Sequence, residues 1–430
     1  MKATRIITTV FIALASLAAN AQEGAWNGEL NIVGTKLPLV FNFSGDGCTM
    51  DSPSQGAKGI PAEKTIKDDG TIKLSVAMIG ATFEGKMENG EIKGTYTQNG
   101  FPIPLTLKPG KLVVKRPQTP VAPFPYKEEN ISFTNAGYTF NGTLTLPQNY
   151  SKQTPVVLMV TGSGQQNRDE ELFDHKPFAV IADALARQGI ASLRYDDRGW
   201  NDKNIDFYQF TTNDFLQDAA SALPLLRKRF NKVGILGHSE GGTIAMMLAA
   251  EGKADFIVSL AGMAISGKET LVMQNRQAMS AINLPKDMVD SYCATISNIL
   301  NEIANGKKTS EITIDGVPDN LKPILKRSLE QADSPYIRHF ITIDAGKQLS
   351  KIKCPVLALN GTKDTQVDCA ANTTILETGL SNCKHTIKKI DGVNHLFQHC
   401  STDSVVEYQQ IEETIAPEVL ETITKWINEL

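Results

Sequence analysis

The chain has 430 residues, more than one ordinary domain, and its 41% hydrophobic content is ample for a large core. The formal net charge is −4, and charges of both signs are scattered along the sequence instead of forming blocks. The sequence therefore lacks the basic footprint of a nucleic-acid-binding protein, and we expect no nucleic-acid partner. Composition carries no information on the oligomeric state.

The N-terminal residues have the pattern of a secretory signal peptide. Two basic residues precede an apolar run, and small residues follow it up to Ala21. This order predicts cleavage after Ala21 and export to the periplasm or the extracellular space. The alternative is a membrane anchor, but the run is short for a bilayer span and contains Thr and Ser. We expect residues 1–21 to be removed and the product not to be stably inserted in a membrane.

The sequence of residues 22–108 is typical of an all-β domain. Short alternating runs such as "ATFEGKMENG" and "EIKGTYTQNG" are separated by turn-forming residues. Period-2 alternation interrupted by Asn-Gly and Asp-Gly indicates antiparallel hairpins in series, and so predicts a small β-barrel or sandwich. Residues 109–126 include five prolines between Pro109 and Pro125, which predicts a stiff linker.

From residue 127 to residue 430, predicted strands alternate with predicted helices. "PVVLMVTGSG" is a continuous apolar strand that stops at glycines, and "FAVIADALARQG" is a helix closed by Gly189. This alternation predicts an α/β domain with a mostly parallel sheet and helices on both faces. Residues 264–347 carry helical patterns without a buried strand, which predicts a helical cap over the carboxyl edge of the sheet.

An apolar strand meets an apolar helix in "VGILGHSEGGTIAMML", residues 233–248. The junction, GHSEG, matches the G-x-S-x-G nucleophile elbow with Ser239 at its centre. The glycines let the strand and the helix pass close to the turn, and the serine is forced into unfavourable dihedral angles. Its hydroxyl then lies at a helix start, where negative charge is stabilised. We predict a nucleophile at Ser239; the alternative is a structural turn.

A serine hydroxyl needs a base to become a nucleophile, and the chain has six histidines. His395, in "DGVNHLF" after the last predicted strand, matches a base that arrives in the order Ser, acid, His. His399, one helical turn later, is the alternative base. A His395–His399 metal pair is a further alternative, but no third ligand at useful spacing accompanies it. We therefore expect neither a metal nor another cofactor.

The carboxylate that orients the base should follow the preceding strand. "VLALNGTKDTQVD" places Asp364 just beyond that strand, where it would fix the tautomer of His395 and stabilise the imidazolium. Asp368 is the alternative acid. Asp391 is too close to His395 along the chain to be a good candidate for the carboxylate that orients it.

The negative oxygen that forms during the reaction needs backbone donors. One is expected to be the N–H of Glu240, the residue after the nucleophile. The other is expected to be the N–H of Ser163 in "TGSGQQNRDEE", where Gly162 and Gly164 let the backbone turn close to substrate. A phosphate-binding loop is the alternative reading, but no Gly-Lys-Ser/Thr sequence follows these glycines.

The segments "TGSGQQNRDEE", "LRYDDRGW", "GHSEGG", "NGTKD" and "GVNHLF", in this order, resemble the α/β-hydrolase superfamily. More narrowly, the chain is similar to EstD-type secreted carboxylesterases, which join an N-terminal β domain to a capped hydrolase domain. The resemblance covers about residues 127–430. It implies hydrolysis of carboxylic esters, often with short acyl chains, and assigns Ser239, Asp364 and His395 as the catalytic triad.

The sequence thus predicts an exported serine hydrolase that cleaves a small-molecule carboxylic ester through an acyl-enzyme. A serine peptidase of the prolyl-oligopeptidase kind would use the same triad, but the N-terminal β segment is too short for a β-propeller. A glycan- or cell-wall-binding protein with an inactive hydrolase domain is the second alternative. The intact set of serine, aspartate and histidine argues against it.

Overall fold

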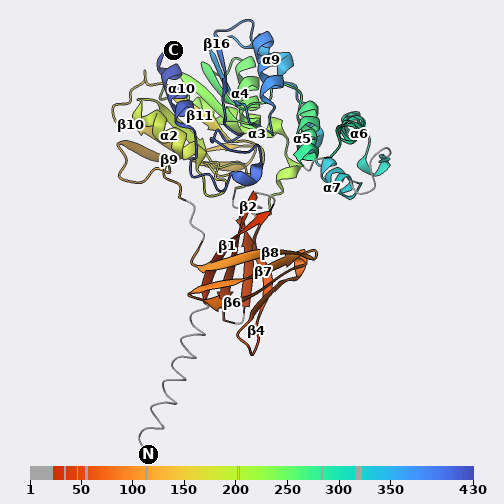
Figure 1. The fold of residues 1–430 in the computed structure, drawn as a ribbon. Helices are drawn as coiled ribbons and strands as arrows, with labels where there is room; N and C mark the ends of the chain where they lie inside the picture. Colours follow the sequence, from red (N-terminus) through yellow and green to blue (C-terminus); the bar gives the residue numbers. More distant parts are fainter. Residues whose placement is uncertain are drawn as a thin grey trace, which may run out of the picture. The chain divides into compact units, whose positions relative to one another are not determined.

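The computed structural model describes residues 23–32, 35–45, 47–53, 57–111, 115–200, 202, 204–281, 284–314 and 322–430 (Figure 1). The predicted signal peptide, residues 1–21, lies outside the described residues. The chain divides into two compact units, one running to Lys115 with Val406–Gln410 added, the other formed by Arg116–Val405 and Ile411–Leu430. Within the described ranges, no helix combines the length and the apolar character that a bilayer crossing requires.

The first unit is a closed barrel in which neighbouring strands are antiparallel. Its strands are β1 (Gly24–Ile32), β2 (Thr35–Ser44), β3 (Gly47–Ser52), β4 (Ala57–Ile66), β5 (Ile72–Val76), β6 (Ala81–Glu88), β7 (Glu91–Gln98) and β8 (Phe101–Pro109). Alternate residues face a packed interior that contains Trp26, Phe41 and Phe83. The period-2 pattern in the sequence is therefore the alternation between barrel interior and surface, and of the two expected architectures the structure has the barrel.

The second unit is built on a mixed eight-stranded sheet with the order β16-β15-β14-β13-β11-β12-β10-β9. Its strands are β9 (Tyr126–Asn135), β10 (Tyr138–Pro147), β11 (Val156–Val160), β12 (Ala191–Tyr195), β13 (Val233–His238), β14 (Phe256–Leu260), β15 (Val356–Gly361) and β16 (His385–Ile390). β10 is antiparallel to both β9 and β12, whereas the neighbours from β12 to β16 are parallel. The carboxyl ends of β11, β13, β15 and β16 therefore meet at one edge.

The helices of the second unit either cover the two faces of this sheet or lie in the segment between β14 and β15. They are α2 (Pro177–Arg187), α3 (Thr212–Arg227), α4 (Glu240–Ala250), α5 (Gly267–Ala281), α6 (Lys286–Ala304), α7 (Lys322–Ala332), α8 (Pro335–Phe340), α9 (Cys369–Gly379) and α10 (Pro417–Asn428). Apolar residues of α3, α4 and α9 share one core cluster, and those of α2 and α10 share another. Consecutive residues of β13 alternate between the two, with Ile235 in the first cluster and Leu236 in the second. A strand buried on both faces therefore reads as a continuous apolar run.

The chain between β14 and β15, where the sequence predicts a cap over residues 264–347, contains the four helices α5 to α8 in its described part. Figure 1 shows α5, α6 and α7 side by side at one flank of the second unit. They have a core of their own, in which Tyr292 and Ile296 of α6 and Leu325 of α7 are buried. The amphipathic pattern of this segment therefore reflects packing among its own helices as well as on the sheet.

Part of the proline-rich segment 109–126 belongs to the second unit. The Arg116 guanidinium donates hydrogen bonds to the carbonyl oxygens of Phe173 and Ile411, and the side-chain amide of Gln118 binds three backbone groups of the segment before α10. These contacts tie the start of the unit to its last helix. The linker residues after position 115 are thus part of the structure that they precede.

We predict that a fragment of residues 116–430 is more stable than a fragment of residues 127–430. The shorter fragment lacks the hydrogen bonds of Arg116 and Gln118, and each such bond contributes about 0.5–1.5 kcal/mol. Thermal unfolding should therefore give the shorter fragment a melting temperature lower by about 2 °C or more. Equal melting temperatures would show that the second unit does not need these contacts.

Candidate active site

Ser239 forms the sharp turn between β13 and α4. Its backbone has φ 53° and ψ −120°, a conformation that costs a non-glycine residue on the order of 1–3 kcal/mol. The surrounding structure holds it there, because the Ser239 N–H donates to the carbonyl of Leu260 (2.8 Å) and the Ser239 carbonyl accepts from the N–H of Gly242 (2.9 Å). A strained serine between a buried strand and a buried helix has the geometry of a nucleophile elbow.

Two glycines permit this turn because no Cβ fits at their positions. A Cβ on Gly237 would lie well under 3.0 Å from the carbonyl oxygen of Gly241, a distance that real Cβ atoms essentially never show. A Cβ on Gly241 would clash in the same way with the carbonyl oxygen of Val160 at the end of β11. Both obstacles are backbone atoms, so a larger residue would displace a strand or the helix.

His395 and Asp364 form a buried pair beyond the ends of β16 and β15. Nδ1 of His395 lies 2.7 Å from Oδ2 of Asp364, and the carboxylate has no exposed surface. Oδ1 of Asp364 accepts two further hydrogen bonds, from the N–H groups of Gln366 and Val367, each 2.8 Å long. An ionised carboxylate only accepts, so the histidine proton is on Nδ1 and the lone pair of the neutral ring is on Nε2.

The alternative acid and base each have a structural partner. Asp368 caps α9 by accepting a backbone N–H of its first turn. His399 is half exposed, and its two ring nitrogens lie 2.9 Å from carboxylate oxygens of Glu413 and Glu418. Over the residues that the structure describes, no three His, Cys, Asp or Glu side chains are grouped so that they could hold a metal ion.

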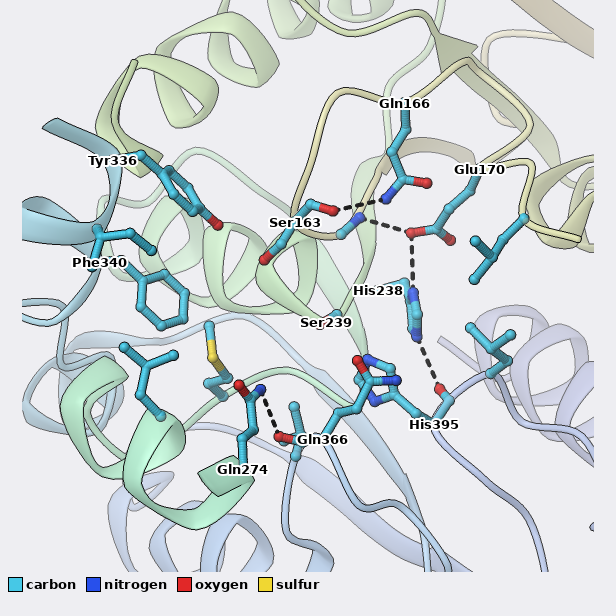
Figure 2. Close-up of a pocket in the computed structure, with 17 residues that line it drawn as sticks. Ser163, Gln166, Glu170, His238, Ser239, Gln274, Tyr336, Phe340, Gln366 and His395 are labelled. Carbon is cyan, nitrogen blue, oxygen red and sulfur yellow. Dashed lines mark hydrogen bonds and ion pairs between the residues drawn. The ribbon is translucent and has the colours of Figure 1, made fainter. Parts of the chain in front are cut away.

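A cavity of about 320 Å³ brings the predicted site residues together (Figure 2). Ser239, His395 and Ser163 all line it, and Asp364 reaches it through its hydrogen bond to His395. The apolar part of the wall consists of Leu172, Met263, Leu271, Ile337, Phe340, Val367 and Leu396. The strand ends thus supply the polar groups, and the predicted cap segment and neighbouring loops supply much of the apolar wall.

Carboxylates anchor the loop that follows β11. The hydroxyl of Thr161 and the N–H of Gln166 donate to Asp197 at 2.9 and 2.8 Å, although burial raises the pKa of this carboxyl well above its usual range. The N–H of Gly162 donates to Oε1 of Glu170 at 2.7 Å. By contrast, the backbone N–H of Ser163 donates no hydrogen bond to another residue in the described part of the chain. The backbone N–H of Glu240 donates none there either. Both expected oxyanion donors are therefore available.

Comparison with known families and solved structures gives the following matches. Residues 175–296 match the family model described as serine aminopeptidase, S33. Est1E from Butyrivibrio proteoclasticus with bound ferulic acid is 18% identical, with a TM-score of 0.44 and coverage of 70% of this chain and 98% of that chain. Dienelactone hydrolase from Anabaena variabilis is 17% identical, with a TM-score of 0.42 and coverage of 71% of this chain and 98% of that chain.

Esterase EstD of Thermotoga maritima is 26% identical to this chain over an alignment of 304 residues, which covers 69% of this chain and 68% of that protein. The chain resembles the esterase-type α/β-hydrolases. The resemblance and the enzyme class predicted from the motifs are thereby confirmed.

The side chain of Glu240 has a structural role that the sequence analysis did not predict. The buried carboxylate accepts hydroxyl hydrogen bonds from Ser163 (2.7 Å), Thr212 (2.5 Å) and Tyr336 (2.5 Å). Burial and the nearby Glu240 raise the pKa of Tyr336 well above its usual range, so its hydroxyl keeps the proton that it donates. Glu240 thus joins the elbow to the loop after β11, to α3 and to α8. No spacing in the sequence predicts three partners from such distant segments.

Proposed function

We propose that the protein is an exported serine hydrolase that cleaves carboxylic esters of small molecules. The observation that carries the proposal is a single cavity lined by the strained Ser239 and by His395, whose Nδ1 is held by the buried Asp364. The similarity to an esterase supports an ester as the bond that is cleaved. Export rests on the signal-peptide pattern of residues 1–21.

The reaction proceeds in two halves. The Ser239 hydroxyl attacks the ester carbonyl carbon while Nε2 of His395 takes its proton, and Asp364 stabilises the resulting imidazolium. The N–H groups of Ser163 and Glu240 stabilise the negative oxygen of the tetrahedral intermediate. His395 then returns the proton to the leaving alcohol as the C–O bond breaks. Water, deprotonated by His395, then attacks the acyl-Ser239 ester, and His395 returns the proton to the Ser239 oxygen as that C–O bond breaks and the acid is released.

We propose that the acyl group is short, as the resemblance implies, and uncharged, as the wall of the cavity favours. Three glutamines supply polar groups, and no Lys or Arg among the described residues lines the cavity. The ring of His238 also lines the cavity, but both of its nitrogens are engaged, so a carboxylate on the acyl chain would be buried without a free charged partner. We also propose that the segment 264–347 acts as a cap, since Leu271, Tyr336 and Phe340 belong to it and line the same cavity.

The family description as a serine aminopeptidase suggests a second candidate function, removal of an N-terminal amino acid. Such a substrate carries a free ammonium group, which would need a carboxylate in the cavity. Among the described lining residues the carboxylate is Glu170, and it is already engaged by the N–H of Gly162 and by the ring of His238. The described wall therefore favours the ester.

We predict that 4-nitrophenyl butyrate is a better substrate than 4-nitrophenyl hydrogen succinate or leucine 4-nitroanilide. The second compound adds a carboxylate and the third an ammonium group, and neither charge has a free partner in the described wall. An unpaired charge that costs about 1.4 kcal/mol lowers kcat/KM tenfold, so we expect at least that difference. Initial rates measure it. Preference for the succinate would contradict the uncharged site, and preference for the anilide would favour the peptidase.

Ser239→Ala should abolish both ester hydrolysis and labelling by a fluorophosphonate probe. The hydroxyl supplies the nucleophile and little packing, so kcat should fall on the order of a million-fold while the protein still folds. Ser381→Ala is the matched control, because Ser381 is exposed and lies outside the cavity. A Ser239→Ala protein within tenfold of the parent activity would rule out Ser239 as the nucleophile.

Asp364→Asn should lower kcat on the order of ten-thousand-fold. An amide at this position favours the tautomer of His395 that carries its proton on Nε2, and that tautomer cannot accept the serine proton. The matched control is Asp368→Asn, which keeps an oxygen to cap α9 and should retain activity within about threefold. If the two variants showed the reverse pattern, Asp368 would be the acid.

A further inference from the structure

His238, the residue before the elbow serine, lies between a carboxylate and the loop that carries His395. Its Nδ1 is 3.0 Å from Oε1 of Glu170, and its Nε2 is 2.9 Å from the carbonyl oxygen of His395. Figure 2 shows Glu170, the ring of His238 and the backbone of His395 connected in this order. The rings of His238 and His395 are 4.7 Å apart between centroids, and His238 is buried.

The proton count of this arrangement fixes the charge of His238. A backbone carbonyl oxygen can only accept, so Nε2 of His238 carries a hydrogen. Oε1 of Glu170 also accepts the N–H of Gly162 at 2.7 Å, and an ionised carboxylate can only accept, so with Glu170 ionised Nδ1 carries a hydrogen too. A neutral imidazole has one N–H, and both bonds together therefore require the imidazolium.

The groups around His238 stabilise its positive charge. Burial disfavours the cation, but the charge and hydrogen bond of Glu170, the carbonyl of His395 and the more distant Asp364 outweigh it and raise the pKa of His238. Asp197 also lies near Glu170, but it accepts its hydrogen bonds from the loop after β11 and not from His238. The buried cation therefore has one carboxylate as its direct partner.

We infer that Glu170 and His238 form a buried carboxylate–imidazolium pair that positions the two halves of the catalytic machinery. The carboxylate holds the N–H of Gly162, next to the oxyanion donor of Ser163, and the imidazolium holds the carbonyl of His395, the base. Neither side chain takes part in a bond-making step, so both are positioning residues. Their effect on catalysis rests on the proposed function, whereas the charge state of His238 does not.

The charge state can be measured directly on the full-length protein by ¹⁵N nuclear magnetic resonance of the histidine rings. We expect His238 to show two protonated ring nitrogens throughout the range from pH 6 to pH 8. The ring resonances of His238 are identified by their absence from the spectrum of His238→Gln. If that variant fails to fold, they are identified by correlating the ring nitrogens with the backbone resonances of the same residue. A ring with one protonated nitrogen at pH 7 would overturn the inference, whether or not the protein hydrolyses esters.

The positioning effect is tested by Glu170→Gln, with Glu171→Gln as the matched control. The amide introduced by Glu170→Gln keeps an oxygen for the N–H of Gly162 but removes the negative charge, so His238 should lose one ring proton and release one of its two partners. Displacement of the base or the oxyanion loop should then lower kcat about 10- to 100-fold with a smaller change in KM. Glu171 is bound by the side chains of Asn167 and Lys176, away from the cavity, and its variant should match the parent.

The results of these experiments distinguish failure of this inference from failure of the proposed function. Loss of the second ring proton together with the fall in kcat supports the pair, whereas an unchanged kcat in Glu170→Gln overturns its positioning effect. A parent enzyme inactive on all three chromogenic substrates would instead contradict the proposed function and leave the ring-proton measurement valid.

Discussion

The close approach of three backbones at residues 237–241 is the constraint on which the site depends. The ends of β11 and β13 and the first turn of α4 pass each other at distances that exclude any Cβ on Gly237 or Gly241. This proximity brings Ser163, on the loop after β11, beside the elbow residue Glu240, whose carboxylate accepts the hydrogen bond of the Ser163 hydroxyl. It also forces Ser239 into its positive φ, which turns the side chain out of the strand and into the cavity.

The close packing of backbones fixes the turn at Ser239 but not the loop after β11. Carboxylates hold that loop in place. Asp197, Glu170 and Glu240 each accept hydrogen bonds from the loop after β11, at its hydroxyls or its backbone N–H groups. A buried acceptor left without its donor costs about 1–3 kcal/mol, so each carboxylate opposes movement of the loop away from the serine. The loop is thereby preorganised before a substrate arrives, which is what stabilisation of a developing charge requires.

The triad residues and the carboxylates that support them differ in how far the sequence could predict them. Ser239, Asp364 and His395 were predictable because each follows an apolar strand, and parallel strands end at one edge. The side-chain bonds of Glu240 and Glu170 were not, because their partners lie on separate segments with no fixed spacing. Nothing in the sequence indicates a charge on His238, and the inference of one depends on its two acceptors in the structure. Similarly, the prolines after Gly110 indicated a linker, whereas the contacts of Arg116 depend on tertiary structure.

Under the proposed function, substrate selection and catalysis share a side chain. Tyr336 of α8 lines the cavity and donates its hydroxyl to Glu240, whose own N–H is the proposed oxyanion donor. A change in the helices between β14 and β15 that moves α8 therefore alters the shape of the acyl site and also the support of the elbow. Residues such as Leu271 on α5 line the cavity without a bond to the elbow residue. Substitutions at Leu271 can therefore change which acyl groups fit at little cost to turnover, whereas substitutions at Tyr336 affect both.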